Sequence, residues 1–170
     1  VWRERLSLLL ESTGEGIFGI DMAGCCVFVN RSAARQLGWP AEQIIGRNMH
    51  ELIHHTHADG RHYPECDCPI FNAFRQGLPC RGDEEVVWRG DGTAFYAEYS
   101  SHPIVEHGQV QGAVVTFLDI SERRRAQELQ RVRELAQHQE SVREAERTRI
   151  AREIHDELGS LLVALKMDVH

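Results

Sequence analysis

Hydrophobic residues in the first 120 positions come in short runs that are interrupted by glycine, proline and polar residues. Runs of this length that are rich in β-branched and aromatic side chains predict strands. Five segments fit this pattern: 16–21, 25–30, 84–90, 93–105 and 109–120. The first two are close enough to form a hairpin. In the fourth segment the aromatic residues at 95, 96 and 99 do not alternate regularly, so the pattern does not determine which of its faces points inward.

Three short helices are predicted between these strands. Residues 31–38 end at Gly38, and glycine favours the left-handed conformation in which many helices end. Residues 40–46 begin at Pro40, which is tolerated in the first turn of a helix. Residues 69–77 repeat hydrophobic side chains at helical spacing. The pattern therefore predicts a mixed α and β domain.

The pattern changes after Asp119, because the remainder contains one glycine, Gly159, and no proline. Oppositely charged residues recur three or four positions apart, as in Glu128 and Arg131, which is typical of a solvated helix face. One long helix is therefore predicted. Asp119 is expected to pair with an arginine such as Arg123 or to cap the start of this helix.

Composition narrows the functional classes. The net charge of −7 argues against nucleic-acid binding, which needs a clustered basic surface. The apolar runs are shorter than the roughly 20 residues of a membrane-spanning helix. The five cysteines do not form a regular disulfide pattern, so a reducing cytoplasm is expected. Since the chain begins at Val1 without a signal peptide, it is expected to be part of a longer protein.

Four segments of the first part resemble the PAS sensor domain family. They are LLLESTGEGIFGIDMAGCCVFVNRSAARQLGW at 8–39, QIIGRNMHEL at 43–52, WRGDGTAFYAEYSSHPI at 88–104 and VVTFLDISERRRAQEL at 114–129. The resemblance extends from Leu8 to about Leu129. It implies an α+β PAS fold, in which small helices accompany a five-stranded antiparallel sheet, followed here by a long C-terminal coiled-coil helix.

The segment ERTRIAREIHDELGSLLVALK at 146–166 resembles the phosphoacceptor helix of sensor histidine kinases of the nitrate-sensor type. The resemblance implies that His155 becomes phosphorylated and that Asp156 assists as a base. Relatives carry an amide residue four positions after the acidic one, where it helps to hydrolyse the partner's aspartyl phosphate. Ser160 stands at that position, and a hydroxyl offers fewer hydrogen-bonding groups than an amide, so weak phosphatase activity is expected.

The same resemblance implies what the rest of the protein supplies. ATP and Mg²⁺ are expected to bind only through a kinase domain that follows His170, and a cognate response regulator is expected to receive the phosphoryl group. The chain is accordingly divided into three parts: a PAS sensor domain with an N-terminal helix at 1–120, a signalling helix at 121–145, and the first helix of the dimerisation and phosphoacceptor domain at 146–170.

An apolar seam predicts how two copies meet. Its residues are four, three and four positions apart, which suits a parallel homodimeric coiled coil: Ile154, Leu158, Leu161 and Leu165. An upstream apolar stripe ends at Val142, twelve residues before Ile154, and this interval does not fit one heptad register. Residues 143–151 are therefore predicted to absorb the mismatch and to act as the switch.

The stretch HHTHADGRHYPECDC at 54–68 contains four histidines and two cysteines, with Cys80 beyond the next helix. Imidazole and thiolate together favour zinc or iron over calcium or magnesium. The preferred ligands are His55, His57, Cys68 and Cys80, with Cys66, His54 and His62 as substitutes. An iron-sulfur cluster is the alternative and would need Cys25, Cys26 or a histidine as its fourth ligand. Haem is less favoured because residues 69–77 contain no histidine.

Two functions follow from these observations. In the first, the PAS domain of a cytosolic kinase senses a metal, redox or gas signal through the cluster and controls autophosphorylation of His155. In the second, the PAS domain is a structural dimerisation module with a zinc staple that relays a signal from an upstream domain. A free-standing metalloenzyme is disfavoured, since the acidic residues near the cluster all lie in turn-like sequence.

Overall fold

The computed structural model describes residues 8–167 and, in its last helix, side chains as far as Leu161. The chain divides into two compact units, Val1–Glu122 and Arg123–His170. Residues 8–12 are helical, and the remainder of the expected N-terminal helix lies outside the described residues.

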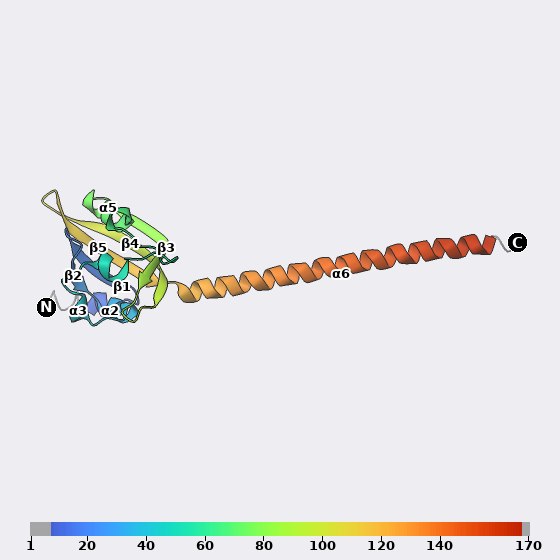
Figure 1. The fold of residues 1–170 in the computed structure, drawn as a ribbon, viewed down its shortest axis with the longest axis horizontal. Helices are drawn as coiled ribbons and strands as arrows, with labels where there is room; N and C mark the ends of the chain where they lie inside the picture. Colours follow the sequence, from blue (N-terminus) through green and yellow to red (C-terminus); the bar gives the residue numbers. More distant parts are fainter. Residues whose placement is uncertain (1–7, 168–170) are drawn as a thin grey trace. The chain divides into compact units, whose positions relative to one another are not determined.

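The first unit is built on a sheet of five antiparallel strands in the order β2-β1-β5-β4-β3 (Figure 1). The strands are β1 (Gly16–Asp21), β2 (Cys26–Val29), β3 (Cys80–Trp88), β4 (Ala94–Glu106) and β5 (Gln109–Asp119). The helical elements between them are α2 (Arg31–Leu37), α3 (Ala41–Ile44), α4 (Met49–Ile53), the 3₁₀ turn η1 (Glu65–Asp67) and α5 (Pro69–Arg75). The predicted antiparallel sheet with small helices is confirmed.

Turn chemistry joins the antiparallel neighbours. In the β1–β2 turn, Oδ1 of Asp21 accepts hydrogen bonds from the N–H groups of Ala23 and Cys25, both at 2.9 Å. Between β4 and β5, His107 and Gly108 both have positive φ angles, of 50° and 78°, as tight hairpin turns require. The turn closes the long hairpin, whose register shifts once near the tip, between Ile104 and Val105.

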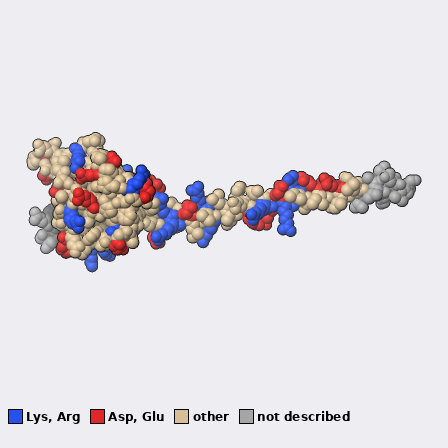
Figure 2. Space-filling view, viewed as in Figure 1, with Lys and Arg blue, Asp and Glu red and all other residues tan. Residues whose placement is uncertain are grey.

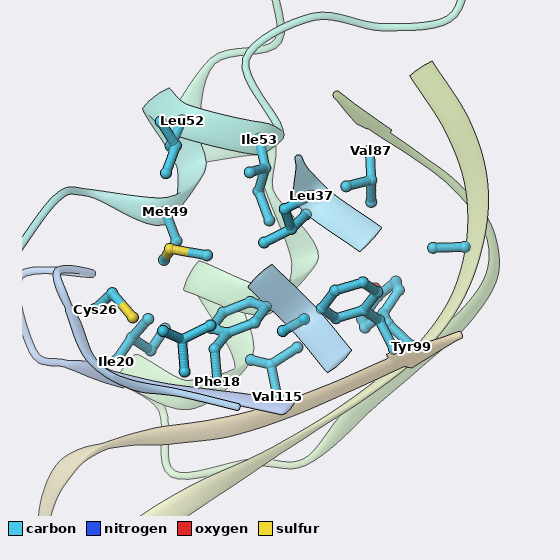
Figure 3. Packing of buried hydrophobic residues seen from close by; sticks show 14 of the residues in the cluster. Phe18, Ile20, Cys26, Leu37, Met49, Leu52, Ile53, Val87, Tyr99 and Val115 are labelled. Atoms are coloured by element: carbon cyan, nitrogen blue, oxygen red, sulfur yellow. The ribbon is translucent and has the colours of Figure 1, made fainter. Parts of the chain in front are cut away.

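Strand β4 settles which aromatic residues point inward. Phe95, Ala97, Tyr99 and Ser101 are buried, so these alternate residues face the core and Tyr96 lies on the opposite face. The core fills the space between this face of the sheet and the helices (Figure 3). Figure 3 shows the sheet residues Phe18 and Val115 directed towards the side of the core from which Met49 and Ile53 project.

The helices agree with most of the predicted boundaries. Gly38 ends α2 with a φ of 69°, and Pro40 directly precedes α3. Helix α4 is an addition, because none of the predicted helices covers it. Asn48 caps it, and the Asn48 side chain accepts a hydrogen bond from the N–H of Glu51 at 3.1 Å. Strand β3 also begins at Cys80, four residues before the predicted segment.

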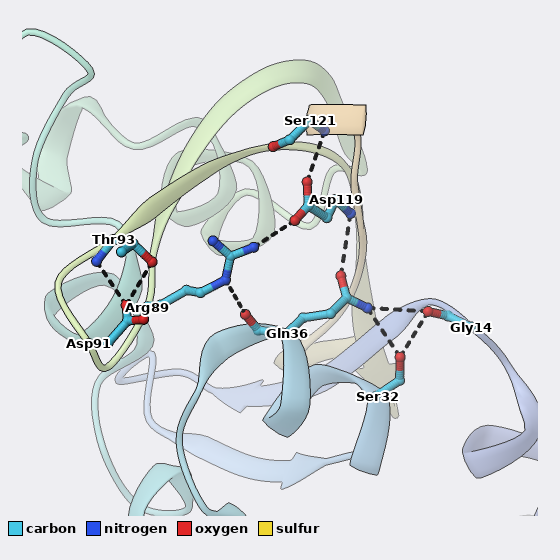
Figure 4. Close-up of polar contacts among 8 residues, drawn as sticks. All are labelled: Gly14, Ser32, Gln36, Arg89, Asp91, Thr93, Asp119 and Ser121. Carbon is cyan, nitrogen blue, oxygen red and sulfur yellow. Dashed lines mark hydrogen bonds and ion pairs between the residues drawn. The ribbon is translucent and has the colours of Figure 1, made fainter. Parts of the chain in front are cut away.

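Asp119 links the end of the sheet to the first residue of α6 (Figure 4). Its Oδ2 lies 2.7 Å from Nη2 of Arg89, and its Oδ1 accepts a hydrogen bond from the N–H of Ser121 at 2.9 Å. The expected cap is therefore confirmed, and Arg89 is an arginine with which Asp119 pairs. Arg89 also donates to the carbonyl oxygen of Gln36, which brings α2 into the same network.

Helix α6 (Ser121–Met167) accounts for the described part of the second unit, and its first two residues belong to the first unit. It confirms the predicted long helix. At 1.5 Å per residue it is roughly 70 Å long. Arginine side chains are interspersed with acidic ones along its described part (Figure 2). Arg149, for example, pairs with Glu146 and Glu153 at 2.6 Å each. None of the helices within residues 8–167 is both long and apolar enough to cross a membrane.

Candidate metal centre

Two short helices bring two histidines and a cysteine together. His50 lies in α4 and His54 is its C-cap, and residues four apart share one face of a helix. Cys68 is the N-cap of α5, directly before Pro69. The ring of Phe71 fixes this helix over the β1–β2 turn: a Cβ atom at Gly24 would lie 2.0 Å from its Cζ, so only glycine permits the contact.

The three side chains meet inside the domain. Sγ of Cys68 lies 3.4 Å from Nδ1 of His54, and one donor atom from each of the three residues lies within 4.8 Å of the other two. Their exposed fractions are 5% for His50, 6% for His54 and 1% for Cys68. Because buried polar groups lose their hydration, such a cluster needs internal partners.

The outer ring nitrogens have such partners. Nε2 of His50 lies 2.7 Å from the carbonyl oxygen of Tyr63, and Nε2 of His54 lies 2.9 Å from Oε2 of Glu85. Both oxygens accept hydrogen bonds, so each Nε2 carries a proton and a neutral ring keeps its lone pair on Nδ1. Histidines that bind metals are oriented in the same way by an acceptor on the other nitrogen.

The inner nitrogen of His50 differs from that of His54. Nδ1 of His54 lies 3.4 Å from Sγ of Cys68, whereas Nδ1 of His50 is buried and makes no hydrogen bond of good geometry within the described part of the chain, although its ring is close enough to Cys68 to lower the pKa of the thiol. Leaving a buried nitrogen unpaired costs about 1–3 kcal/mol. A cation at the centre of the cluster would give this lone pair a partner.

The cluster is electrostatically coupled. Burial opposes the charged form of Cys68, but interactions with the rings of His50 and His54 outweigh it and lower the pKa of the thiol to about 6. Burial likewise opposes a charged His54, yet its bonds to Cys68 and Glu85 raise its pKa to about 9. The hydrogen bond from His54 lowers the pKa of Glu85. Both shifts favour a thiolate beside an imidazolium when no metal is bound.

The three residues also form part of the wall of an internal cavity of about 40 Å³. Much of the remaining wall is aliphatic or aromatic and includes Phe18, Ile20, Ile53, Val87, Val115 and Phe117. A water molecule needs roughly 10–15 Å³ of such volume, so the cavity has room for about three or four water-sized molecules. Haem would not fit without displacement of the core.

The structure and the sequence favour different ligand sets. Of the preferred residues His55, His57, Cys68 and Cys80, the structure places only Cys68 in the cluster. His54, a predicted substitute, joins it, and so does His50, which lies four residues before the histidine-rich stretch and is not among the predicted ligands. The missing signal is Asn48 followed by Glu51, a capping pattern that predicts α4 and thereby puts His50 and His54 on one face.

The other predicted ligands make different contacts. Nδ1 of His55 lies 2.6 Å from Oγ1 of Thr56, and the ring of His57 stacks on Tyr63 with centroids 3.9 Å apart. The remaining three are outside the cluster: His62 and Cys66 are exposed, and Cys80 is half-buried at the start of β3.

His155 and Asp156 lie on α6, and both are exposed. The seam residues Ile154, Leu158 and Leu161 are also exposed in the single chain, while the side chain of Leu165 lies outside the described residues. The phosphoacceptor position predicted from the sequence is thus accessible beside an uncovered apolar stripe.

Comparison with known proteins places both parts of the chain. Residues 4–120 match the family model described as PAS fold, and residues 146–170 match the model described as histidine kinase. The chain is 29% identical over 124 residues to the probable diguanylate cyclase DgcE of Escherichia coli K12, which covers 72% of the chain and 11% of DgcE. The chain therefore spans only about a tenth of the length of this curated relative.

Solved structures show the same fold. The PAS domain of a Colwellia psychrerythraea protein matches with a TM-score of 0.58 and 21% identity, over 72% of this chain and 99% of that one. The PAS domain of nitrogen regulation protein NR(II) from Vibrio parahaemolyticus matches with a TM-score of 0.54 and 17% identity, over 68% and 97% of the respective chains. The chain belongs to the PAS fold family, and its last 25 residues carry the match to a histidine kinase family.

Proposed function

We propose that this chain is the sensory and dimerisation part of a cytosolic two-component sensor histidine kinase. In this function a metal ion at His50, His54 and Cys68 sets the rate at which His155 is phosphorylated. The observation that carries the proposal is the convergence of two imidazoles and a thiolate in the core, with each imidazole oriented by an acceptor on its outer nitrogen.

The donor set fits zinc or iron. With metal–nitrogen bonds of roughly 2.0 Å and a metal–sulfur bond of roughly 2.3 Å, tetrahedral donors are about 3.5 Å apart. Nδ1 of His54 and Sγ of Cys68 are 3.4 Å apart, so this pair is already spaced for a metal. Binding would displace the proton of His54 Nδ1, which is how metals generally compete at such sites.

An iron-sulfur cluster has less support than a single ion. A cluster of that kind is typically held by four cysteine thiolates, or by two cysteines and two histidines in Rieske centres. Here Cys68 has two imidazoles as its neighbours, and Cys66 is exposed. The cavity of about 40 Å³ likewise favours an ion and a small ligand over a macrocycle.

The output of the proposed function is phosphoryl transfer to His155. A ring nitrogen of His155 attacks the γ-phosphorus of ATP, the new N–P bond forms as the bond to ADP breaks, and Asp156 takes up the ring proton. A response regulator aspartate then accepts the phosphoryl group and His155 is regenerated. Both residues are exposed on α6, as this exchange between domains requires.

The metal is tested by elemental analysis of protein purified without oxygen. We expect about one zinc or iron per chain, and loss of most of it in His50→Ala and in Cys68→Ser, because removing one of few ligands is severe. His62→Ala and Cys66→Ser are matched controls at exposed positions and should retain the metal. Cys80→Ser separates the two ligand sets, since it should matter only if the sequence-predicted set is correct.

Circular dichroism and thermal unfolding of each variant show whether loss of metal is merely loss of fold. Full metal content in a folded His50→Ala/Cys68→Ser double variant would exclude the site. To test the output, residues 1–170 are joined to the second dimerisation helix and ATP-binding domain of a kinase of the same family. Phosphorylation should depend on His155 and respond to metal removal; a metal-independent rate would favour the structural zinc staple.

A further inference from the structure

The protein supplies three ligands to the proposed ion. Within the described residues the group of close donors consists of His50, His54 and Cys68. The nearby carboxylate of Glu85 is engaged by the outer nitrogen of His54. Structural zinc sites usually have four protein ligands, whereas sites with three keep a position for an exchangeable ligand. A three-ligand site here leaves such a position open.

The open coordination position of the proposed ion would face the internal cavity. All three ligands belong to the wall of the 40 Å³ cavity, which extends the site towards the apolar core between α4, α5 and the sheet. The volume limits an incoming ligand to a few heavy atoms. The Cys68 thiolate and the Glu85 carboxylate would together balance the charge of a divalent ion, so an anionic ligand would bring an uncompensated charge into a wall that is largely hydrocarbon.

From these observations we infer that the cavity receives a neutral diatomic molecule, which binds to an iron(II) ion at the open position and is the stimulus of the kinase. This inference rests on the proposed metal site. Iron(II) with a thiolate ligand has the d electrons that such neutral ligands require, and zinc, with its filled d shell, does not bind them appreciably. Coordination changes no oxidation state and releases no group other than a bound water.

The walls of the cavity provide a route from ligand to output. Val115 and Phe117 line it from β5, and the same strand ends at Asp119, whose carboxylate holds Ser121. A ligand that presses on these two side chains acts on the strand that precedes α6. The inference therefore predicts that the cavity wall, as well as the metal ligands, controls the response.

Nitric oxide is the chemical used to test it. Metal-free protein is loaded anaerobically with one equivalent of Fe²⁺ and titrated with nitric oxide, and the half-integer-spin signal of an iron nitrosyl is followed by electron paramagnetic resonance. Wild type should give a saturable signal. Iron-free protein should give none, which excludes a reaction at the cysteines alone as the source.

The cavity is tested by Val115→Phe, which fills the space and leaves the ligands intact. Iron content should be unchanged while the affinity for nitric oxide falls about tenfold or more. Val114→Phe is the matched control, since Val114 is 36% exposed on the opposite face of the strand and Val115 is 1% exposed. Should Val115→Phe fail to fold, Val115→Ile adds one methylene group and should lower the affinity by a smaller factor.

The outcomes separate the two proposals. Stoichiometric iron with no nitrosyl signal overturns this inference and leaves the metal site standing. Equal affinities in wild type and in folded Val115→Phe also overturn it, because the ligand then binds outside the cavity. Absence of metal binding altogether removes both.

Discussion

The two units of this chain are stabilised in different ways. In the PAS domain, residues distant in sequence pack into one core, as when Phe74 of α5 is fully buried among strands and other helices. In α6 the ion pairs of Arg149 join residues three and four positions apart, and apolar side chains such as Leu135 remain exposed. The first unit therefore buries its apolar side chains within itself, whereas α6 leaves an apolar face uncovered within the described residues.

The largest effect should come from a substitution in the core of the PAS domain, compared with one on the exposed face of α6. Phe74→Ala removes a side chain with 0% exposure and should lower the free energy of unfolding of the PAS domain by about 3–5 kcal/mol. Leu135→Ala, at 57% exposure, should leave that value unchanged within about 0.5 kcal/mol. Urea denaturation measures both, and similar losses in the two variants would contradict the contrast.

A second prediction concerns the helix alone. Inserting two residues after Glu146 makes the interval from Val142 to Ile154 fit one heptad register, so the seam becomes continuous. In the kinase fusion described above, the ratio of stimulated to basal His155 phosphorylation should fall to about one, because a single packing removes the alternative arrangement. A seven-residue insertion keeps the original mismatch and is the control. A normal response in the two-residue variant would remove register from the mechanism.

A third prediction lies where the first unit ends. Asp119→Asn keeps an oxygen that can accept the Ser121 N–H but removes the charge that pairs with Arg89. Since this pair is partly exposed, the free energy of unfolding should fall by only about 1 kcal/mol. Urea denaturation provides the measurement, with the exposed Asp83→Asn as the control. A loss as large as that of Phe74→Ala would mean that this network belongs to the core.

The smallest effect is expected at Ser160. In the kinase fusion, Ser160→Gln should raise the rate of response-regulator dephosphorylation by a few-fold, because an amide offers both a donor and an acceptor to the attacking water. The rate of disappearance of the phosphorylated regulator measures this. Brisk dephosphorylation by wild type that falls on substitution would show that Ser160 does not have the expected role.

Local signals in the sequence were sufficient for most of the fold. Gly38 and Pro40 mark helix ends because glycine and proline restrict the backbone whatever surrounds them. The early start of β3 at Cys80 was not predicted, since its first residues are mostly polar and gain their place by pairing with β4. Which residues of β4 point into the core likewise depends on which face of the strand packs against the helices.

The cluster of His50, His54 and Cys68 was harder to predict, because it too depends on contacts between residues distant in the sequence. Cys68 and His54 are in the histidine- and cysteine-rich stretch, so composition points to them. His50 lies outside that stretch and acquires its place through α4, and Glu85 reaches His54 from a strand thirty-one residues away. Sequence spacing favoured His55 and His57, but stacking and a local hydrogen bond engage their rings elsewhere.

The unpaired nitrogen of His50 has a practical consequence. A ligand that binds this buried nitrogen in the folded domain stabilises the fold, and the stabilisation grows with the logarithm of the ligand concentration. The midpoint temperature of heat denaturation should therefore rise with the concentration of a metal ion that binds the cluster. Measuring this midpoint temperature with different metal ions would rank the ions by their affinity for the domain. The measurement needs neither ATP nor a response regulator.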